Sequence, residues 1–346
     1  MEYSGTAIIG AAWGDEGKGD SVDQAAADHD IVVRFQGGKN AGHVLDGKYA
    51  VRQIPAGVRH SHCLLYDGMG MTLDLPALLA EKKEMEQYGF HLKDRLFIAG
   101  LAVVVQPSQI YDDNIHGGGI GTTGNGIGPA YAARALRRQG DRLCDLRVAD
   151  LVEDPQFARE VMQENFRYVQ SLYGAEPNPK IPSINSIIEA AAELSEHIVL
   201  DPTWLATKAK NGSRILFEGG QGTRLDNIFG TRPYSTGSNT IAAAAYVGSG
   251  LPITYPIKVI GVTKALETRV GNGPFPSEFG GRRSELYCDE KDENGKPKHT
   301  KEFETQNYQP STLLQSDNPF LLGVGLRMVG NEYGTNTKRP RRLGAL

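Results

Sequence analysis

Short runs of apolar, often β-branched residues recur along the chain, and longer segments with apolar residues every three or four positions lie between them. Apolar runs of about four to eight residues are typical of buried strands, and their alternation with helical segments is typical of a parallel sheet. The strands are expected at Thr6–Ala12, Ile31–Phe35, Cys63–Tyr66, Arg95–Val105, Arg214–Glu218 and Ile257–Leu266.

The segments with helical periodicity fall between these runs. Helices are expected at Gly17–Ala27, Pro76–Tyr88, Pro129–Arg138, Pro155–Tyr173 and Ser183–Leu200. In the last of them, one apolar face is formed by Ile184, Ile187, Ile188, Ala191 and Leu194. The pattern predicts an α/β fold, with one large domain over residues 1–346 and a central, mostly parallel β-sheet flanked by helices.

Composition fits a single large core, because 40% of the 346 residues are hydrophobic. The stretch Cys288–Gln309 is rich in charges of both signs and poor in apolar residues, so we expect a flexible, solvated loop there. A net charge of −4 gives no sign of nucleic-acid binding. No apolar run is long enough to span a membrane and the first residues do not resemble a secretion signal, so a cytoplasmic protein is expected, in the host cytoplasm if phage-encoded.

The cysteines Cys63, Cys144 and Cys288 are odd in number, widely spaced and without a CxxC pair. Neither a disulfide framework nor a cysteine zinc site is therefore expected. His60 and His62 beside Cys63 could form a metal cluster, but they enter an apolar strand and no fourth ligand lies nearby in the sequence.

Candidate chemistry begins where the first expected strand runs into WGDEGKG, Trp13–Gly19. A glycine-rich turn between a strand and a helix binds anions, because free N–H groups and the helix dipole point at it. The stretch departs from the usual P-loop, since alanine replaces the first glycine and glycine follows Lys18. Asp15 and Glu16 would repel phosphate unless Mg²⁺ bridges carboxylate and phosphate. We therefore expect a nucleotide phosphate with magnesium; the alternative is a plain turn with Asp15 as the helix N-cap.

Three further glycine clusters carry polar side chains suited to a nucleotide. RFQGGKNAGHVL, Arg34–Leu45, follows a strand and contains His43, which can donate to a developing negative charge. GGGIGTTGNGIGPAYAARALRR, Gly117–Arg138, is a glycine and threonine loop before a helix with several arginines, which suits a second phosphate. FEGGQGTRLD, Phe217–Asp226, places Gln221 after a strand, as expected for an amide that reads a base edge.

Together the clusters resemble adenylosuccinate synthetase, the ligase family that joins aspartate to a 6-oxo purine nucleotide. Six motifs occur in the family's order and cover nearly the whole chain: the four clusters, TRVGNGPFP at Thr268–Pro276 and TKRPRR at Thr337–Arg342. The resemblance implies a carbon–nitrogen ligase with a fold related to P-loop nucleoside triphosphatases. It also implies small-molecule substrates, Mg²⁺ and a homodimer, with no nucleic acid and no membrane as partner.

The implied reaction has two steps: a nucleoside triphosphate phosphorylates the 6-oxygen, and the amine of aspartate then displaces that phosphate. By resemblance, Asp15 would remove the N1 proton of the base, and Lys18 would neutralise phosphate charge. His43 and Gln221 would stabilise charge on the 6-oxygen and on the migrating phosphoryl group. The metal would be held by Asp15 and Gly42.

The resemblance also implies three groups of binding residues. The triphosphate would be bound by Gly14, Glu16, Gly17, Lys18, Gly19, Gly42, His43 and Arg341. The monophosphate nucleotide would be bound by Asp15, Asn40, Thr122, Thr123, Arg137, Gln221, Thr236 and Val270, with Arg137 coming from the neighbouring subunit. Aspartate would be bound by Thr335, Asn336, Thr337 and Arg339, whose guanidinium can hold a carboxylate by two hydrogen bonds.

Two departures from the family pattern bear on the substrates. Gly220 replaces the usual alanine beside Gln221, which would leave space near the base. Family members continue for roughly a hundred residues past the arginine segment, into an element that reads the guanine of GTP, whereas this sequence stops at Leu346. We therefore expect ATP or dATP as donor and the bacteriophage branch, which uses dGMP and makes N6-succino-2-amino-2'-deoxyadenylate for 2-aminoadenine DNA. The alternative is action on IMP with GTP or ATP.

Two other classes of protein fit the sequence less well than a ligase. A nucleotide-binding switch or regulatory module could use the same glycine loops, but it needs neither His43 nor Gln221 and would show no aspartate-dependent turnover. A dehydrogenase would need GxGxxG and an acidic residue about twenty positions further on, which the first strand turn does not have.

Overall fold

A computed structural model of the chain describes residues 4–119, 121–174, 178, 181–269, 271–334 and 339–345. Within these residues a seven-stranded parallel sheet has the strand order β11–β7–β5–β2–β12–β1–β13. Its strands are β1 (Gly5–Gly10), β2 (Ile31–Arg34), β5 (Leu64–Asp67), β7 (Leu96–Ala99), β11 (Ile198–Val199), β12 (Ile215–Glu218) and β13 (Ile257–Val262). The predicted α/β fold with a central, mostly parallel sheet is confirmed.

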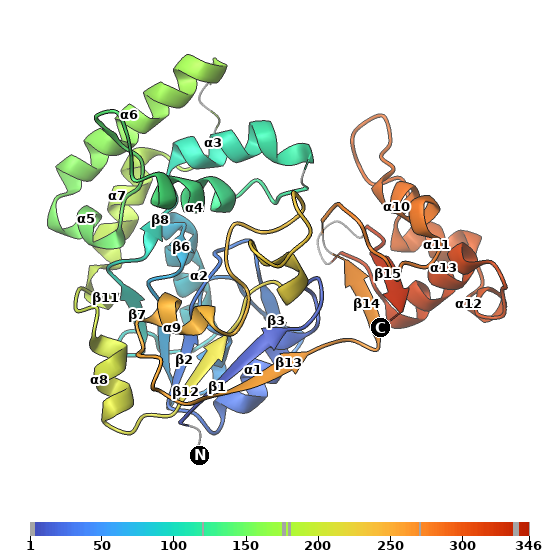
Figure 1. Ribbon diagram of the computed structural model, residues 1–346, viewed down its shortest axis with the longest axis horizontal. Helices are drawn as coiled ribbons and strands as arrows, with labels where there is room; N and C mark the ends of the chain where they lie inside the picture. Colours follow the sequence, from blue (N-terminus) through green and yellow to red (C-terminus); the bar gives the residue numbers. More distant parts are fainter. Residues whose placement is uncertain are drawn as a thin grey trace.

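Helices flank this sheet, as Figure 1 shows. They are α1 (Lys18–Ala26), α2 (Leu75–Gln87), α3 (Pro107–His116), α4 (Ile127–Leu136), α5 (Val148–Glu153), α6 (Pro155–Tyr173), α7 (Ile184–Glu193), α8 (Trp204–Lys210) and α9 (Ala244–Ser249). The central strand β2 is buried along its whole length, as expected for a parallel strand covered on both faces. Helix α6 has the predicted bounds, because Asp154 caps its first turn and Gly174 ends it in the left-handed conformation.

Short ribbons and turns complete the fold around the main sheet. The two-stranded ribbons pair β3 (His43–Leu45) with β4 (Tyr49–Val51), β6 (Thr72–Leu73) with β8 (Val103–Val104), β9 (Arg138–Gln139) with β10 (Arg142–Leu143), and β14 (Leu266–Arg269) with β15 (Arg342–Ala345). Single 3₁₀ turns lie at η1 (Ala56–Arg59), η2 (Gly117–Gly119), η3 (Ser195–His197) and η4 (Thr223–Leu225).

Three predicted elements are wrong in extent. The segment Arg95–Val105 is two strands, because the chain turns at Gly100, whose N–H donates to the carbonyl of Val199, and β8 then pairs with β6. The segment Ile257–Leu266 is likewise divided between β13 and β14, which belong to different sheets. The helix predicted at Ser183–Leu200 ends at Glu193, and its last residues form β11 beside β7. In each case pairing with a distant strand outweighs the local pattern.

The C-terminal elements lie to one side of the main sheet, reached through the connection between β13 and β14 (Figure 1). They are β14, β15, α10 (Gly281–Asp289), α11 (Lys301–Asn307), α12 (Pro310–Leu313) and α13 (Pro319–Gly330). A small apolar cluster of Leu313, Phe320 and Val324 packs these helices together. The prediction of one solvated loop over Cys288–Gln309 is wrong for α11, which begins at the N-cap Thr300 and buries Glu304.

Candidate active site

The carboxyl ends of the adjacent strands β1, β12 and β2 open into a cavity of about 700 Å³. Loops that follow the carboxyl ends of parallel strands meet at one edge of the sheet, where α/β proteins bind their ligands. The predicted residues that line the cavity are Gly14, Asp15, Gly17, Lys18, Gly19, Asn40, Gly42, His43, Thr123, Gln221 and Arg341. The structure therefore brings together Asp15, Lys18, His43 and Gln221, the four residues predicted to be catalytic.

The loop between β1 and α1 has the backbone conformation of an anion-binding turn. Gly14, Asp15 and Gly17 have positive φ angles of 89°, 67° and 81°, which turn backbone N–H groups toward one side. Asp15 is the one non-glycine residue of the three, and a positive φ at a non-glycine residue occurs often at functional sites. Its side chain is 39% exposed, and its Oδ2 lies 2.8 Å from Nη2 of Arg341. The carboxylate thus faces the cavity beside a fixed positive charge.

Glu16 occupies a different place from the one predicted. Its Oε1 accepts hydrogen bonds from the backbone N–H groups of Ala12 and Gly14, at 3.1 and 2.9 Å. Its Oε2 accepts a bond of 2.5 Å from Nζ of Lys18. The buried carboxylate therefore shapes the loop from inside and does not line the cavity, so the prediction that it contacts the triphosphate is not supported by the geometry. The reason is local: two amides and an ammonium already satisfy it.

The loop after β2 meets the loop after β12 across the cavity. Nε2 of Gln221 donates to Oδ1 of Asn40 at 3.1 Å, which fixes the orientation of both amides. His43 lies against the start of α1, where a Cβ on Gly19 would come within 2.6 Å of its ring. Glycine at this position therefore lets the histidine approach the phosphate loop closely.

A row of buried charges lies beneath His43. Glu218, Arg34 and Asp67 are register partners on the adjacent strands β12, β2 and β5, and all three are almost fully buried. Oε1 of Glu218 lies 3.2 Å from Nε2 of His43 and 4.0 Å from Nε of Arg34. Burial alone would raise the pKa of Glu218, but the contact with His43 and the charge of Arg34 together lower it below its ordinary value. Glu218 is therefore an anion that can hold the imidazole in place.

Asp67 at the other end of the row behaves in the opposite way. Burial raises the pKa of its carboxyl well above the ordinary value, although the charge of Arg34 opposes that effect. Arg34 is thus placed between one ionised carboxylate, Glu218, and one carboxyl group that favours its neutral form. The charge of Arg34 is therefore balanced mainly by Glu218, which also contacts His43.

Several predicted residues lie outside the cavity lining. Thr122 donates its hydroxyl to Asp113 at 2.8 Å, and Arg137 is exposed at the C-terminus of α4. The N–H of Thr236 donates to the carbonyl of Leu225. Nε of Arg339 donates to the carbonyl of Cys288 on α10. The remaining predicted residues, Val270, Thr335, Asn336 and Thr337, lie outside the described residues.

Sequence reasoning missed other residues that line the cavity, namely Lys39, Arg52, Asn125, Lys264 and Glu332. Lys264 follows the carboxyl end of β13, which is the one signal that could have drawn attention to it. Its Nζ lies 2.5 Å from Oε1 of Glu332. Together with the pair Asp15–Arg341, this ion pair joins the C-terminal elements to the loops of the main sheet at the cavity.

The weaker hypothesis of a metal cluster at His60, His62 and Cys63 gains no support. His60 pairs with Asp23 at 3.3 Å, while His62 lies 3.5 Å from the sulfur of Cys63. Across the part of the chain that the structure describes, no group of three or more His, Cys, Asp or Glu side chains is arranged to hold a metal ion. In the same residues no helix has the length and apolar character needed to cross a membrane.

Comparison with known proteins agrees with the geometry. Residues 7–346 match the adenylosuccinate synthetase family. The chain is 39% identical over 343 residues to adenylosuccinate synthetase 2 of Cupriavidus pinatubonensis, covering 98% of this chain and 74% of that one. It is 37% identical over 354 residues to the adenylosuccinate synthetase of Polynucleobacter necessarius, covering 98% and 70%.

Two solved structures share the fold. The fully ligated adenylosuccinate synthetase of Plasmodium falciparum has a TM-score of 0.77 and 32% identity, covering 99% of this chain and 71% of that one. Succinoaminodeoxyadenylate synthetase of cyanophage S-2L, bound to dGMP and dATP, has a TM-score of 0.62 and 20% identity, covering 100% and 79%. At 20% identity this second likeness concerns the fold alone.

The fold, the phosphate loop and these likenesses define a carbon–nitrogen ligase that acts on nucleotides. The chain belongs to the adenylosuccinate synthetase family. Members of this family bind nucleotides and aspartate and are generally dimeric. The relatives favour the alternative of an adenylosuccinate synthetase over the bacteriophage branch that the sequence analysis preferred.

Proposed function

We propose that the protein is an adenylosuccinate synthetase that joins L-aspartate to IMP at the expense of a purine nucleoside triphosphate. The observation that carries this proposal is the presence of Asp15, His43 and Gln221 in one cavity with the phosphate loop. A protein that only binds nucleotides would need the loop, but it would not need a base, a donor and an amide around the same space.

In the first step Asp15 accepts the N1 proton of the base and the freed electron pair makes the 6-oxygen nucleophilic. That oxygen attacks the γ-phosphorus, the bond to the β–γ bridging oxygen breaks, and the nucleoside diphosphate leaves. Arg341, whose Nη2 lies 2.8 Å from Oδ2 of Asp15, orients the carboxylate before the proton moves. Lys18 contributes positive charge at the loop, where the phosphates would lie.

His43 and Gln221 stabilise charge on the 6-oxygen and on the phosphoryl group. His43 is held by Glu218 at 3.2 Å, and Gln221 is held by Asn40 at 3.1 Å, so neither side chain must reorganise during transfer. In the second step the amine of aspartate attacks C6, the bond between C6 and the 6-oxygen breaks, and inorganic phosphate leaves with a proton released by the amine.

Magnesium is a general property of the family, and the residues present fit it. Asp15 and Gly42 both line the cavity and offer a carboxylate and a carbonyl oxygen. Mg²⁺ usually binds through one or two carboxylates together with substrate phosphates, so two protein ligands suffice. When bound, it would neutralise phosphate charge during transfer.

The preference for IMP is the finer part of the proposal. The case for dGMP relied on space left by Gly220, but a methyl group there would contact the side chain of Gln36 at 3.3 Å and Cβ of Ala41 at 3.6 Å. Gln36 is buried and does not line the cavity. Ala41 does line the cavity, but a methyl at 3.6 Å would only be in ordinary contact with it, so its absence opens little space there. The names of the relatives support IMP as the substrate.

Parallel reactions test this preference. Enzyme, aspartate and Mg²⁺ are mixed with IMP or dGMP and with ATP, dATP or GTP, and phosphate release is followed. We expect turnover with IMP to exceed that with dGMP by at least about tenfold, because a site built for one base edge leaves polar groups unpaired with another. Turnover with dGMP alone would instead place the protein in the bacteriophage branch, and the triphosphate that supports the reaction identifies the donor.

The dimer belongs to the proposal as well. Arg137 is exposed at the end of α4 and does not line the cavity of its own chain. This exposed position is the one expected of a residue that reaches the phosphate of IMP bound in a neighbouring subunit.

Replacement of Arg339 by alanine tests the aspartate site. The KM for aspartate should rise by about tenfold or more, because hydrogen bonds to charged groups contribute about 1.5–3 kcal/mol, while the KM for IMP changes little. Steady-state kinetics with each substrate varied in turn measure both constants. Arg282→Ala is the matched control, because Arg282 is an exposed arginine of the neighbouring helix α10 that pairs only with Glu285 among the contacts described for it. Equal increases in both KM values would contradict the assignment of Arg339.

A further inference from the structure

A buried arginine joins the C-terminal helices to the segment that reaches the cavity. Arg327 on α13 is 1% exposed, and its guanidinium lies against the fully buried carboxylate of Glu304 on α11. Nη2 donates to Oε1 of Glu304 at 2.8 Å, and Nε lies 3.2 Å from both carboxylate oxygens. The hydroxyl of Tyr333 donates to Oε2 of Glu304 at 2.6 Å and completes this pairing.

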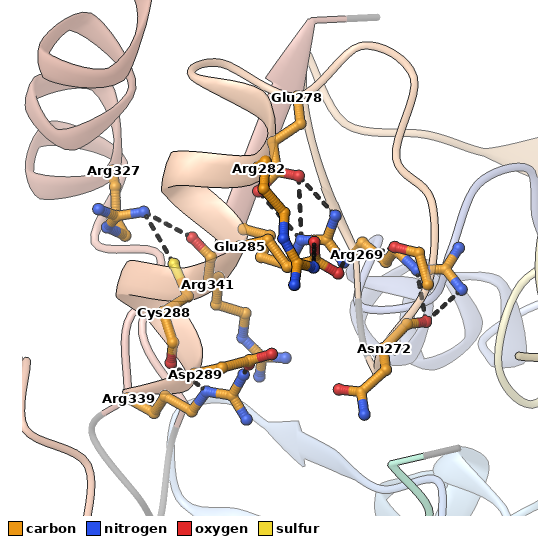
Figure 2. A network of polar contacts seen from close by, with 12 residues as sticks. Arg269, Asn272, Glu278, Arg282, Glu285, Cys288, Asp289, Arg327, Arg339 and Arg341 are labelled. Carbon is orange, nitrogen blue, oxygen red and sulfur yellow. Dashed lines mark hydrogen bonds and ion pairs between the residues drawn. The ribbon is translucent and has the colours of Figure 1, made fainter. Parts of the chain in front are cut away.

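The other edge of the guanidinium faces the arginine segment. Nη1 of Arg327 donates to the backbone carbonyl of Arg341 at 2.8 Å and contacts the sulfur of Cys288 at 3.6 Å. Figure 2 shows Arg327 pointing from its helix toward both groups. A single planar side chain thus ties together α11, α10 and the backbone at Arg341.

The side chain of Arg341 then extends from this fixed backbone to the catalytic loop. The N–H of Arg341 donates to the carbonyl of Glu332 at 3.0 Å, so both polar groups of its peptide backbone are bonded. Nη2 of Arg341 lies 2.8 Å from Oδ2 of Asp15. The path from Glu304 to Asp15 therefore runs through consecutive polar contacts without a gap.

A branch of the same contacts leads to the residue expected at aspartate. The carbonyl of Cys288 accepts a hydrogen bond of 2.6 Å from Nε of Arg339, whose guanidinium also pairs with Asp289. Figure 2 shows Arg339 and Arg341 near Cys288, at the end of helix α10. Arg327 contacts the sulfur of Cys288 and the carbonyl of Arg341. It therefore contacts both Arg341 and the residue to which Arg339 is bonded.

We propose that Arg327 is a positioning residue that fixes the backbone of Arg341 and thereby the orientation of its guanidinium toward Asp15 and the donor phosphates. The proposal rests on the proposed function, because it assigns Arg341 to the donor side of that site. Stabilisation of the fold alone does not account for the geometry: a buried ion pair contributes little net stability, and an apolar pair would serve as well. Lysine could pair with Glu304, but its compact ammonium cannot also span the distance to the Arg341 carbonyl in the same plane.

The variant Arg327→Lys tests the proposal. We expect the KM for the triphosphate to rise by about tenfold and kcat to fall, because the variant loses the hydrogen bond from the guanidinium to the carbonyl of Arg341. The loss of a hydrogen bond to a charged group typically weakens an interaction by about tenfold or more. The KM for IMP should stay within about twofold, because Asn40 and Gln221 are held by loops of the main sheet. Binding of the triphosphate by calorimetry should weaken in parallel, whether or not the variant turns over.

Two further variants make the test independent of folding. Tyr333→Phe keeps Arg327 but removes a hydrogen bond that orients Glu304, the carboxylate that holds the guanidinium. Arg327 should then be held less firmly, and the same constants should move in the same direction by a few-fold. Asn165→Ala is the structural control: Asn165 is buried on α6, donates to Gln106 at 2.8 Å and lies outside the cavity lining. Asn165→Ala should lower the melting temperature, and any change in KM should be the same for the triphosphate and for IMP.

The outcomes are distinct. A folded Arg327→Lys with unchanged constants, or one that changes the KM for the triphosphate and the KM for IMP equally, as expected of Asn165→Ala, overturns the proposal. If Arg327→Lys does not fold, unchanged constants in Tyr333→Phe overturn it. Absence of aspartate-dependent turnover in the unmodified enzyme defeats the proposed function instead, and calorimetric binding of the triphosphate still decides whether Arg327 positions Arg341.

Discussion

Replacement of Asp15 by asparagine is expected to abolish turnover while nucleotide binding survives. The amide keeps the shape of the carboxylate but cannot accept the N1 proton, so kcat should fall by roughly 100- to 10,000-fold, the range of a lost general base. The fold should tolerate the change, because Asp15 has a φ of 67° and asparagine adopts the left-handed region as readily as aspartate. Phosphate release with IMP and aspartate measures the loss of turnover, and calorimetry measures the retained binding of IMP.

The chain offers a closely matched control for this variant. Asp46 is also an exposed aspartate with positive φ, at 52°, and it lies in the turn between β3 and β4 outside the cavity lining. Asp46→Asn makes the same chemical change on the same type of backbone, so it should leave kcat unaltered. An Asp15→Asn enzyme that retains more than a tenth of the kcat would show that another group takes the proton.

The loops of the site could be predicted from the sequence because their signals are local. Glycine clusters that directly follow apolar strands must lie at the carboxyl ends of a parallel sheet, and three of them are brought together by adjacent strands. Because β1, β12 and β2 are adjacent, Asp15, His43 and Gln221 reach one cavity. Their placement follows from strand order, which alternation of strands and helices already restricts.

Helix α11 could not be predicted, because its burial depends on a long-range contact between polar residues. Glu304 lies in a charged stretch that reads as solvated, yet it is fully buried by Arg327, which is 23 positions away in the sequence. A local pattern treats each charge as exposed and has no means to detect the partner. The same limit explains β11: Ile198 and Val199 continue a helical pattern but pair with β7.

Substrate preference depends on even finer detail. Gly220 lies next to Gln221 in the sequence, and the loss of a methyl group there was expected to enlarge the base site. In the fold a Cβ on Gly220 would meet the side chain of Gln36 at 3.3 Å and that of Ala41 at 3.6 Å, so the missing methyl leaves little open space beside Gln221. Similarity over the whole chain is the better guide, because it averages over every contact of the site.

The pairing of His43 with Glu218 leads to the second prediction with a large effect. Glu218 is buried, ionised and 3.2 Å from Nε2 of His43, and it does not line the cavity. Among its described side-chain partners, His43, Arg34 and Ala56, only His43 lines the cavity, so we expect Glu218 to act on the reaction through the histidine. His43→Asn should lower kcat by roughly 100- to 1,000-fold, the cost of removing one donor from developing charge. Glu218→Gln keeps the shape but loses the charge, and should lower kcat by about tenfold or more, since hydrogen bonds to charged groups contribute about 1.5–3 kcal/mol.

The two changes should not add, and that is the sharper part of the prediction. Once His43 is replaced by asparagine, Glu218 has no imidazole to hold, so Glu218→Gln in that background should cost at most about twofold in kcat. The four enzymes are compared by phosphate release at saturating substrates, with thermal unfolding as a check that Arg34 does not destabilise the sheet when its ionised neighbour is removed. Fully additive losses would mean that Glu218 supports the site through Arg34 and the sheet, because only a path that bypasses His43 could still operate after the histidine is gone.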